Sequence, residues 1–339
     1  MNAVTGTESS GGSSAADGDF MLSVRNLQVE FYNERGTVHA VQDVSWDVRS
    51  GATLGVVGES GSGKSVTAAA VMDLVPITGA VVGGQILWHG VQMSSAELAK
   101  LRGSRITMVF QDPMSALNPL VSVGPQITEV LRKHRGMSRN AAKRRALELF
   151  DLVGIPEPAR RFRQYPFEFS GGMAQRAVIA MALAAEPELL ITDEPTTALD
   201  VTIQAQILDL LSTLQAELGI AIVLITHDLG VVAGVADHLV VMYAGRVVER
   251  GLARSIFANP SHPYTRGLLE STPHPREVRD RLVPIPGNPP VVTTILPGCA
   301  FADRCTSVTD RCRTLRPKLE PVEGSAVGEM REVACWHAA

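Results

Sequence analysis

A glycine-rich stretch, GESGSGKSVT, occupies residues 58–67 and directly follows the apolar segment TLGVV. The residues that come next, KSVTAAAVMDLV, are rich in helix-forming alanine and contain no glycine or proline after the lysine. The order along the chain is therefore a buried strand, a loop with unusual backbone freedom, and a helix. A fold that contains this stretch must therefore place a glycine-rich loop between the end of a buried strand and the start of a helix.

Four residues of the stretch, Gly58, Gly63, Lys64 and Ser65, match the phosphate-loop pattern G-x-x-x-x-G-K-S/T. Glycines allow successive backbone N–H groups to turn toward one anion, and the following helix N-terminus adds its positive dipole end. Lys64 is expected to reach the β- and γ-phosphates, and the Ser65 hydroxyl to bind Mg²⁺. A chance match in a flexible turn is the alternative, and it leaves the flanking strand and helix unexplained. The stretch predicts a site for nucleotide phosphates.

Short apolar runs of strand length alternate with helical stretches such as VTIQAQILDLLSTLQAEL. This alternation predicts an α/β core with a mostly parallel sheet. Residues 22–31 and 44–48 predict two strands before the loop, and the polar, Arg-rich pattern that follows residue 113 predicts an inserted helical subdomain over about 113–185. The later apolar runs are ITMVF (106–110), LLIT (189–192), IAIVLIT (220–226) and HLVVMY (238–243).

Length and composition suggest how the chain is divided. A chain of 339 residues predicts two domains, or one domain with an extension. Residues 1–20 are rich in serine and glycine and lack the features of a signal peptide, so a disordered tail is expected there. From residue 260 onward prolines become frequent, which predicts an extension over 260–339 with little regular structure. The core is then expected over 21–259.

Charge and hydropathy argue against a nucleic-acid-binding protein and against a chain that spans the membrane. With 19% charged residues and a net charge of −4, the chain gives no reason to expect nucleic acid as a partner. No apolar run reaches the roughly 18 residues that a membrane-spanning helix needs. The expected location is therefore the cytoplasm.

Three further positions are candidates for phosphate chemistry. Asp193 and Glu194 end an apolar strand, where the first could hold Mg²⁺ through water and the second could polarise an attacking water. Ser170 opens the segment SGGMAQRAVIAMALAA, which predicts either a second anion site or simply a helix cap. His227 follows the strand VLIT and is a candidate for a γ-phosphate contact, with a structural role as the alternative.

These segments, in this order, resemble the nucleotide-binding subunit of ABC transporters. GESGSGKS resembles Walker A, VFQDP the Q-loop, FSGGM the signature, LLITDE Walker B, TALD the D-loop and THD the switch histidine. The resemblance runs from about Leu22 to Gly251 and implies a P-loop ATPase domain over 21–259. Two such subunits close head to tail in this family, so the signature of one would cover the ATP of the other.

The resemblance also implies a set of site residues. The catalytic residues would be Glu194, His227 and Gln111, and Mg²⁺ would be held by Ser65, Gln111 and Asp193. Phe31 would stack on adenine. Its neighbour Tyr32 is the alternative residue for this role, and packing in the core is the alternative role for Phe31. The contacts to ATP would be Phe31, Gly58, Ser60, Gly61, Gly63, Lys64, Ser65, Val66, Ser170, Gly171, Gly172 and Asp200.

A narrower resemblance is to the dipeptide/oligopeptide importer branch, in GESGSGKSVT, FQDPMSALNP, DEPTTALDVTIQAQILDLL and HPYTRGLLESTP. The chain departs from the branch at Phe169, where leucine is usual, and at Phe167, where histidine is frequent. The resemblance implies a peripheral subunit on the cytoplasmic face of the membrane that hydrolyses ATP to power import of di- or oligopeptides. Its partners would be a second ATPase subunit, identical or different, two membrane permeases and an extracytoplasmic peptide-binding protein.

Other functions remain open. An importer of nickel or another small solute belongs to the same branch. A soluble, non-transport ABC ATPase predicts long coiled-coil inserts or a second cassette, and neither is seen in the sequence. A metal-dependent regulatory protein would leave Glu194 without a role.

All four cysteines, Cys299, Cys305, Cys312 and Cys335, lie in the extension, and no C-x-x-C pair occurs. Four thiols in a proline-rich segment suggest a metal that holds it together, with free thiols as the alternative. Zinc and iron–sulfur are equally compatible with this chemistry. The spacing GCAFADRCTSVTDRC resembles the peptide-importer branch, and this resemblance favours a 4Fe–4S cluster on the four cysteines.

Overall fold

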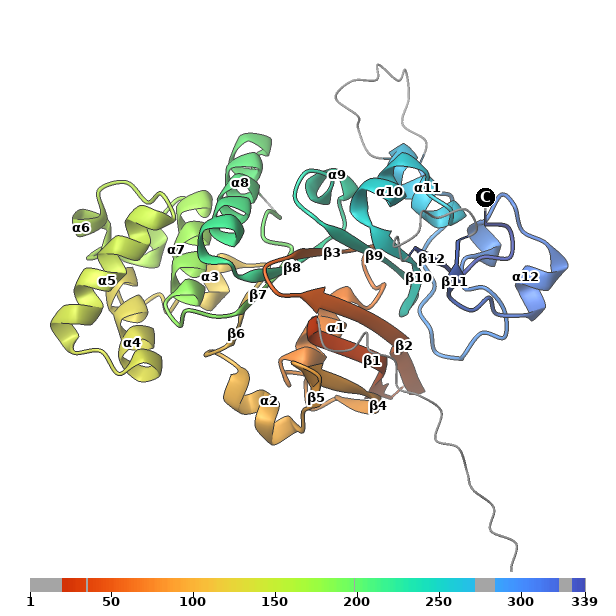
Figure 1. Ribbon diagram of the computed structural model, residues 1–339, viewed down its shortest axis with the longest axis horizontal. Helices are drawn as coiled ribbons and strands as arrows, with labels where there is room; N and C mark the ends of the chain where they lie inside the picture. Colours follow the sequence, from red (N-terminus) through yellow and green to blue (C-terminus); the bar gives the residue numbers. More distant parts are fainter. Residues whose placement is uncertain (1–19, 35, 198, 272–283, 323–330, 339) are drawn as a thin grey trace, which may run out of the picture.

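The computed structural model describes residues 20–34, 36–197, 199–271, 284–322 and 331–338. Within these ranges the chain forms two β-sheets surrounded by helices (Figure 1). The predicted disordered tail lies outside the described residues, except for Phe20, which begins the first strand. Among the described residues, no helix combines the length and the apolar character that crossing a bilayer demands.

The smaller sheet is antiparallel, with strand order β2-β1-β4-β5. Its two long strands pair from Phe20 opposite Arg49 to Asn33 opposite Gly36, so the second strand is longer than the sequence predicts. The apolar side chains of β1 are fully buried at Leu22, Leu27 and Val29. The strands are β1 (Phe20–Asn33), β2 (Gly36–Arg49), β4 (Gly79–Trp88) and β5 (Val91–Gln92).

The larger sheet carries the phosphate loop, and its order is β11-β12-β10-β9-β3-β8-β7-β6. The five strands from β9 to β6 are parallel, and every residue of β3, β7 and β8 is buried, as expected for strands covered on both faces. The predicted α/β core with a mostly parallel sheet is confirmed. The strands are β3 (Thr53–Val57), β6 (Ile106–Val109), β7 (Leu189–Asp193), β8 (Ala221–Thr226), β9 (His238–Tyr243), β10 (Arg246–Leu252), β11 (Glu320–Pro321) and β12 (Glu332–Val333).

Helices α3 to α7 follow one another between β6 and β7 and lie together at one side of the molecule (Figure 1). Their apolar faces meet at Ile127, Leu131, Leu149 and Phe150, all of which are fully buried. These helices are α3 (Pro113–Ala116), α4 (Val123–Arg135), α5 (Arg139–Leu152), α6 (Pro158–Arg161) and α7 (Gly171–Leu183). The other helices are α1 (Lys64–Val71), α2 (Ser95–Leu101), α8 (Val201–Leu218), α9 (Leu229–Val232), α10 (Ala253–Ala258), α11 (Pro263–Ser271) and α12 (Asp310–Thr314).

The proline-rich extension packs on the core of the large sheet. Phe301 lies 5.2 Å from the Tyr243 ring and 5.3 Å from the Tyr264 ring, between centroids. Strand β12 pairs with β10, and the guanidinium of Arg331 bonds the fully buried carboxylate of Glu249 at 2.9 Å. The expectation that this segment needs a metal in order to fold is therefore not supported, because it shares the apolar core of the main sheet.

The buried histidine His262 gives the extension a predictable response to acid. Its Nδ1 accepts a hydrogen bond from the backbone N–H of Tyr264 at 3.0 Å, and its Nε2 has no partner among the described residues. Complete burial lowers the pKa of His262 from 6.5 to about 3, because a charged imidazolium would be desolvated there. The ring is therefore neutral in the folded chain at neutral and mildly acidic pH.

We expect the free energy of unfolding to fall by about 2 kcal/mol between about pH 7.5 and about pH 5 through His262 alone. The folded pKa lies below the unfolded one, so the stabilisation is present above pH 6.5 and is lost as pH falls toward 3. Urea unfolding at both pH values, compared with His262→Asn, measures this difference. Asn can still accept from the Tyr264 N–H, so an equally steep pH dependence in the variant would contradict the assignment.

Candidate active site

The phosphate loop has glycine where the backbone permits nothing else. Gly58 and Gly63 have φ of 155° and 99°, in the region that side chains disfavour. A Cβ at Gly58 would lie 2.2 Å from the Met242 carbonyl oxygen, and one at Gly63 would lie 2.6 Å from that of Ala40. Gly63 is the N-cap of α1 and offers no side-chain oxygen, so the helix N-terminus keeps its backbone N–H donors for a ligand.

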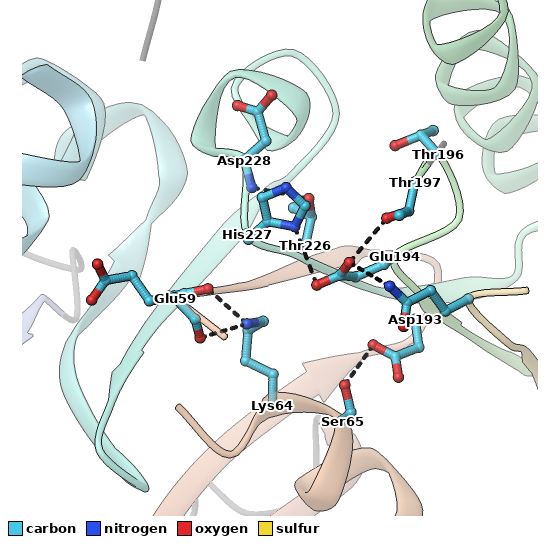
Figure 2. Close-up of polar contacts among 12 residues, drawn as sticks. Glu59, Lys64, Ser65, Asp193, Glu194, Thr196, Thr197, Thr226, His227 and Asp228 are labelled. Carbon is cyan, nitrogen blue, oxygen red and sulfur yellow. Dashed lines mark hydrogen bonds and ion pairs between the residues drawn. The ribbon is translucent and has the colours of Figure 1, made fainter. Parts of the chain in front are cut away.

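The loop folds around the ammonium group of Lys64, whose side chain is buried. Its Nζ donates to the carbonyl oxygens of Gly58 at 2.6 Å and Glu59 at 3.1 Å (Figure 2). Burial lowers the pKa of Lys64, and the charges of Glu194, Asp193 and Glu59 act in the opposite direction. In the described part of the chain, the hydrogen bonds of this cation all go to neutral oxygens, which phosphate oxygens can replace.

The remaining loop residues differ in exposure. Ser60 and Gly61 form the exposed tip, and Val66 is half-buried on α1. The motif pattern leaves the position of Ser62 undefined, and sequence reasoning missed it. Ser62 is buried, its carbonyl accepts from the Gly245 N–H at 3.0 Å, and its hydroxyl lies 3.5 Å from Lys64 Nζ.

Ser65 and Asp193 meet at the end of β7. The Ser65 hydroxyl donates to Asp193 Oδ1 at 2.9 Å, as Figure 2 shows. Burial raises the pKa of Asp193, and the Ser65 hydrogen bond opposes this effect. A hydroxyl and a buried carboxylate together are suited to Mg²⁺, whose ligands are oxygens and whose charge would offset the cost of burying the carboxylate. The predicted Mg²⁺ residues Ser65 and Asp193 are thus neighbours in the fold.

Glu194 is bonded by three side chains from different parts of the sequence. Its carboxylate accepts from Gln111 Nε2 at 3.0 Å. It also accepts from Thr197 Oγ1 at 2.9 Å and lies 3.2 Å from His227 Nδ1, as Figure 2 shows. Its φ is +48°, a backbone conformation that carries strain in a non-glycine residue. Sequence reasoning missed Thr197, although the spacing DEPTT places a hydroxyl three residues after Glu194. Gln111 contacts Glu194, so its predicted role as a Mg²⁺ ligand stays a prediction.

The signature residues lie in another part of the molecule. Ser170 caps α7, which lies among the helices at the left of Figure 1, while α1 lies against the smaller sheet. A Cβ at Gly172 would come within 2.6 Å of Ile203 Cγ2, so α7 and α8 approach closely there, and Gly171 stands beside Leu199. Asp200 is the N-cap of α8, and its Oδ1 accepts from the Ile203 N–H at 3.0 Å. The predicted contacts of Ser170, Gly171, Gly172 and Asp200 with ATP stay predictions.

Phe31, the predicted adenine contact, is half-buried on β1. Its ring lies against Gly79, where a Cβ would come within 2.8 Å of the ring carbons. It also packs on the apolar core of the smaller sheet, so both the stacking role and the core role remain compatible with its position. Tyr32 is 50% exposed and its hydroxyl donates to Glu30 Oε2 at 3.1 Å.

The four cysteines line one small cavity in the extension, beside Trp336 and His337. Burial raises the pKa of the Cys299 thiol to about 11, so its neutral form is favoured. The cavity measures about 10 Å³, which is room for about one water molecule. No group of three or more metal-ligating side chains is arranged around a metal position in the described ranges. The prediction of an extension held together by a metal is therefore not supported by the described residues.

Comparison with known proteins agrees with this geometry. A family model described as "ABC transporter" matches residues 41–197, and one described as "Oligopeptide/dipeptide transporter, C-terminal region" matches residues 248–312. The chain is 49% identical over 321 residues to the dipeptide transport ATP-binding protein DppD of Bacillus subtilis, covering 93% of this chain and 94% of that protein. It is 54% identical to the oligopeptide transport ATP-binding protein OppD of the same organism, covering 84% and 81% respectively.

Solved structures of ATP-binding cassettes resemble about 70% of this chain. A dimeric ATP-binding cassette, solved in a post-hydrolysis state with ADP and phosphate, has a TM-score of 0.62 and 29% identity, covering 69% of this chain and 99% of that chain. A component of an ABC transporter complex from Clostridium perfringens has the same TM-score at 28% identity, covering 71% and 91%. The chain belongs to the ABC transporter family of ATPases, in the group that contains the dipeptide and oligopeptide transport ATP-binding proteins.

Proposed function

We propose that this chain binds and hydrolyses ATP to power the import of dipeptides or oligopeptides. The observation that carries the proposal is the cluster in Figure 2, where Lys64, the Ser65–Asp193 pair and Glu194 lie together at the carboxyl ends of β3 and β7. The substrate class is supported by the match of residues 248–312 and by the names of the relatives. Both observations favour a peptide over nickel or another small solute.

The chemistry follows from the side chains. The loop N–H groups and Lys64 would bind the phosphates, and Ser65 and Asp193 would hold Mg²⁺, which would offset the negative charge that develops on the leaving phosphate. Glu194 accepts the proton of the attacking water. Gln111, Thr197 and His227 hold the Glu194 carboxylate in one orientation through the three contacts described above.

A second ATPase subunit completes the site. Ser170, Gly171, Gly172 and Asp200 lie away from the loop of their own chain, so we place them on the nucleotide of the partner, which is a second copy or a related subunit. Two membrane permeases and an extracytoplasmic peptide-binding protein complete the importer, and the chain works at the cytoplasmic face of the membrane. We propose the division into 1–20, an ATPase domain over 21–259 with helices at about 113–185, and an extension over 260–339.

Reconstitution tests the proposed function. The purified chain alone should hydrolyse ATP slowly, and the rate should rise about tenfold or more when partner subunit, permeases and peptide-loaded binding protein are present, because transition-state donors then come from the partner. Transport of a labelled peptide and of nickel, measured in the same vesicles, distinguishes the two substrates. Full activity in a strictly monomeric preparation would exclude the two-subunit site.

We further propose that the four cysteines bind a 4Fe–4S cluster after local opening of their cavity. The support is their convergence on one place from positions up to 36 residues apart in sequence, together with the thiolate chemistry such a cluster needs. A bound cation would offset the cost of ionising the buried Cys299 thiol. Zinc is the alternative ligand.

Protein purified without oxygen should be brown, absorb at about 400 nm and carry about four irons per chain. Each Cys→Ser change should lower the iron content, and Ser307→Ala, in the same segment, should leave it unchanged. One zinc per chain would exclude the cluster and keep a metal site. Four freely titratable thiols with no bound metal would exclude both.

A further inference from the structure

Glu59, the first residue after Gly58 in the phosphate loop, is held on three sides. Its backbone N–H donates to the Tyr264 hydroxyl at 2.8 Å, and its carbonyl accepts from Lys64 Nζ at 3.1 Å (Figure 2). Its carboxylate receives both Nη atoms of Arg304, at 2.6 Å and 2.9 Å. Two of these three anchors come from residues more than 200 positions further along the chain.

Arg304 is built into the extension as a rigid donor. It is 8% exposed, its Nε donates to the Pro286 carbonyl at 2.7 Å, and its Nη1 donates to the Tyr243 hydroxyl at 3.2 Å. The guanidinium also lies 5.9 Å from the centroid of the Phe301 ring. A planar guanidinium whose three nitrogens are all hydrogen-bonded has little freedom to move, so it fixes the position of the carboxylate that it binds.

We propose that Arg304 is a positioning residue for nucleotide binding, which sets the conformation of the phosphate loop by holding Glu59. The inference rests on the proposed ATP-binding role of residues 58–65. The backbone carbonyl of Glu59 accepts a hydrogen bond from Lys64 Nζ. Movement of Glu59 would therefore change both the backbone conformation of the loop and the position of the ammonium group. The extension thereby contributes to the affinity for ATP, although none of its residues would touch the nucleotide.

The phosphate loop is therefore preorganised for binding only while Arg304 of the extension bonds the Glu59 carboxylate. If loss of the grip leaves the binding conformation populated about one tenth of the time, the apparent Kd for Mg-ATP rises about tenfold. The rate at saturating ATP should change by less than about twofold, because the Glu194 cluster makes no contact with Arg304. A rise in Kd and KM at constant kcat is not what a general loss of folding produces.

The experiment titrates the full-length chain with Mg-ATP by calorimetry and measures kcat and KM in the assembled importer. Arg304→Ala should raise Kd about tenfold, and Arg304→Lys, which keeps the charge but not the fork, should lie between it and the parent. Tyr264→Phe, which removes one anchor of Glu59, should weaken binding in the same direction. Arg313→Ala is the matched control, since Arg313 pairs with Asp303 in the same extension at 2.8 Å but is exposed.

A double-mutant cycle separates positioning from simple damage. If Arg304 acts through Glu59, then Arg304→Ala combined with Glu59→Ala should raise Kd no further than the larger single effect. Additive effects, or an unchanged Kd in both Arg304→Ala and Tyr264→Phe, would overturn the inference while leaving the proposed function intact. Failure of the parent chain itself to bind Mg-ATP would overturn the proposed function. Should Arg304→Ala fail to fold, Arg304→Lys and Tyr264→Phe decide the question.

Discussion

Glu194→Gln should bind Mg-ATP as the parent does and hydrolyse it about 100-fold more slowly or worse. The amide is nearly the same size and keeps its place beside Gln111 and Thr197, but it cannot accept the proton of the attacking water. Nucleotide binding should survive because the loop and the Ser65–Asp193 pair are unchanged. Single-turnover hydrolysis in the assembled importer, alongside calorimetric titration, measures the two effects separately.

Glu188→Gln is the matched control for this variant. Glu188 immediately precedes β7 as Glu194 follows it, and it pairs with Arg105 at the opposite end of the strand. Its substitution should leave hydrolysis within about twofold of the parent, as expected for an exposed ion pair. A normal rate in Glu194→Gln would show that another group accepts the proton.

Lys64→Ala should show the complementary result, with binding lost first. Charge-assisted hydrogen bonds are worth about 1.5 to 3 kcal/mol, so removing the ammonium group should raise the Kd for Mg-ATP by roughly 10- to 100-fold. The fold itself should tolerate the change, because burial already disfavours the charged form of Lys64. Titration calorimetry measures Kd, and thermal unfolding checks the fold.

Lys100→Ala on the exposed face of α2 is the control for Lys64→Ala and should leave the Kd unchanged. Equal affinity in Lys64→Ala and the parent would contradict the role assigned to the loop lysine. Hydrolysis should be lost in both Lys64→Ala and Glu194→Gln, and only the binding measurement tells them apart.

Local sequence determined the parts of the site that are continuous in the chain. The mainly apolar run TLGVV predicts the buried strand β3, the glycines of GESGSGKS predict a loop, and the alanine-rich KSVTAAAVMDLV predicts α1. Asp193 was predictable for the same reason, since it ends a buried strand in a parallel sheet. The strand order that joins these pieces was not predictable from spacing.

Tertiary structure decided which of these residues meet. Gln111, Glu194 and His227 follow β6, β7 and β8, and they form one cluster only because these parallel strands are neighbours with their carboxyl ends at the same edge. Ser170 follows no such strand, and it lies at the start of α7 in the helical part of the chain. The order of these residues in the sequence does not show which of them join the Glu194 cluster and which lie elsewhere.

The extension shows most clearly the difference between what local sequence predicts and what tertiary structure decides. From the sequence it was a proline-rich segment that needed a metal, because apolar residues in it are too few for a separate core. In the fold, Phe301 packs against both Tyr243 and Tyr264, and Arg304 bonds Glu59, 245 positions away in the sequence. The sequence by itself determined the loop, the buried strands and the chemistry of each site residue, since these follow from local backbone and side-chain preferences. Only the tertiary structure decided the Glu194 cluster and the grip on Glu59, because contacts between distant segments depend on how the sheet is ordered and what packs on it.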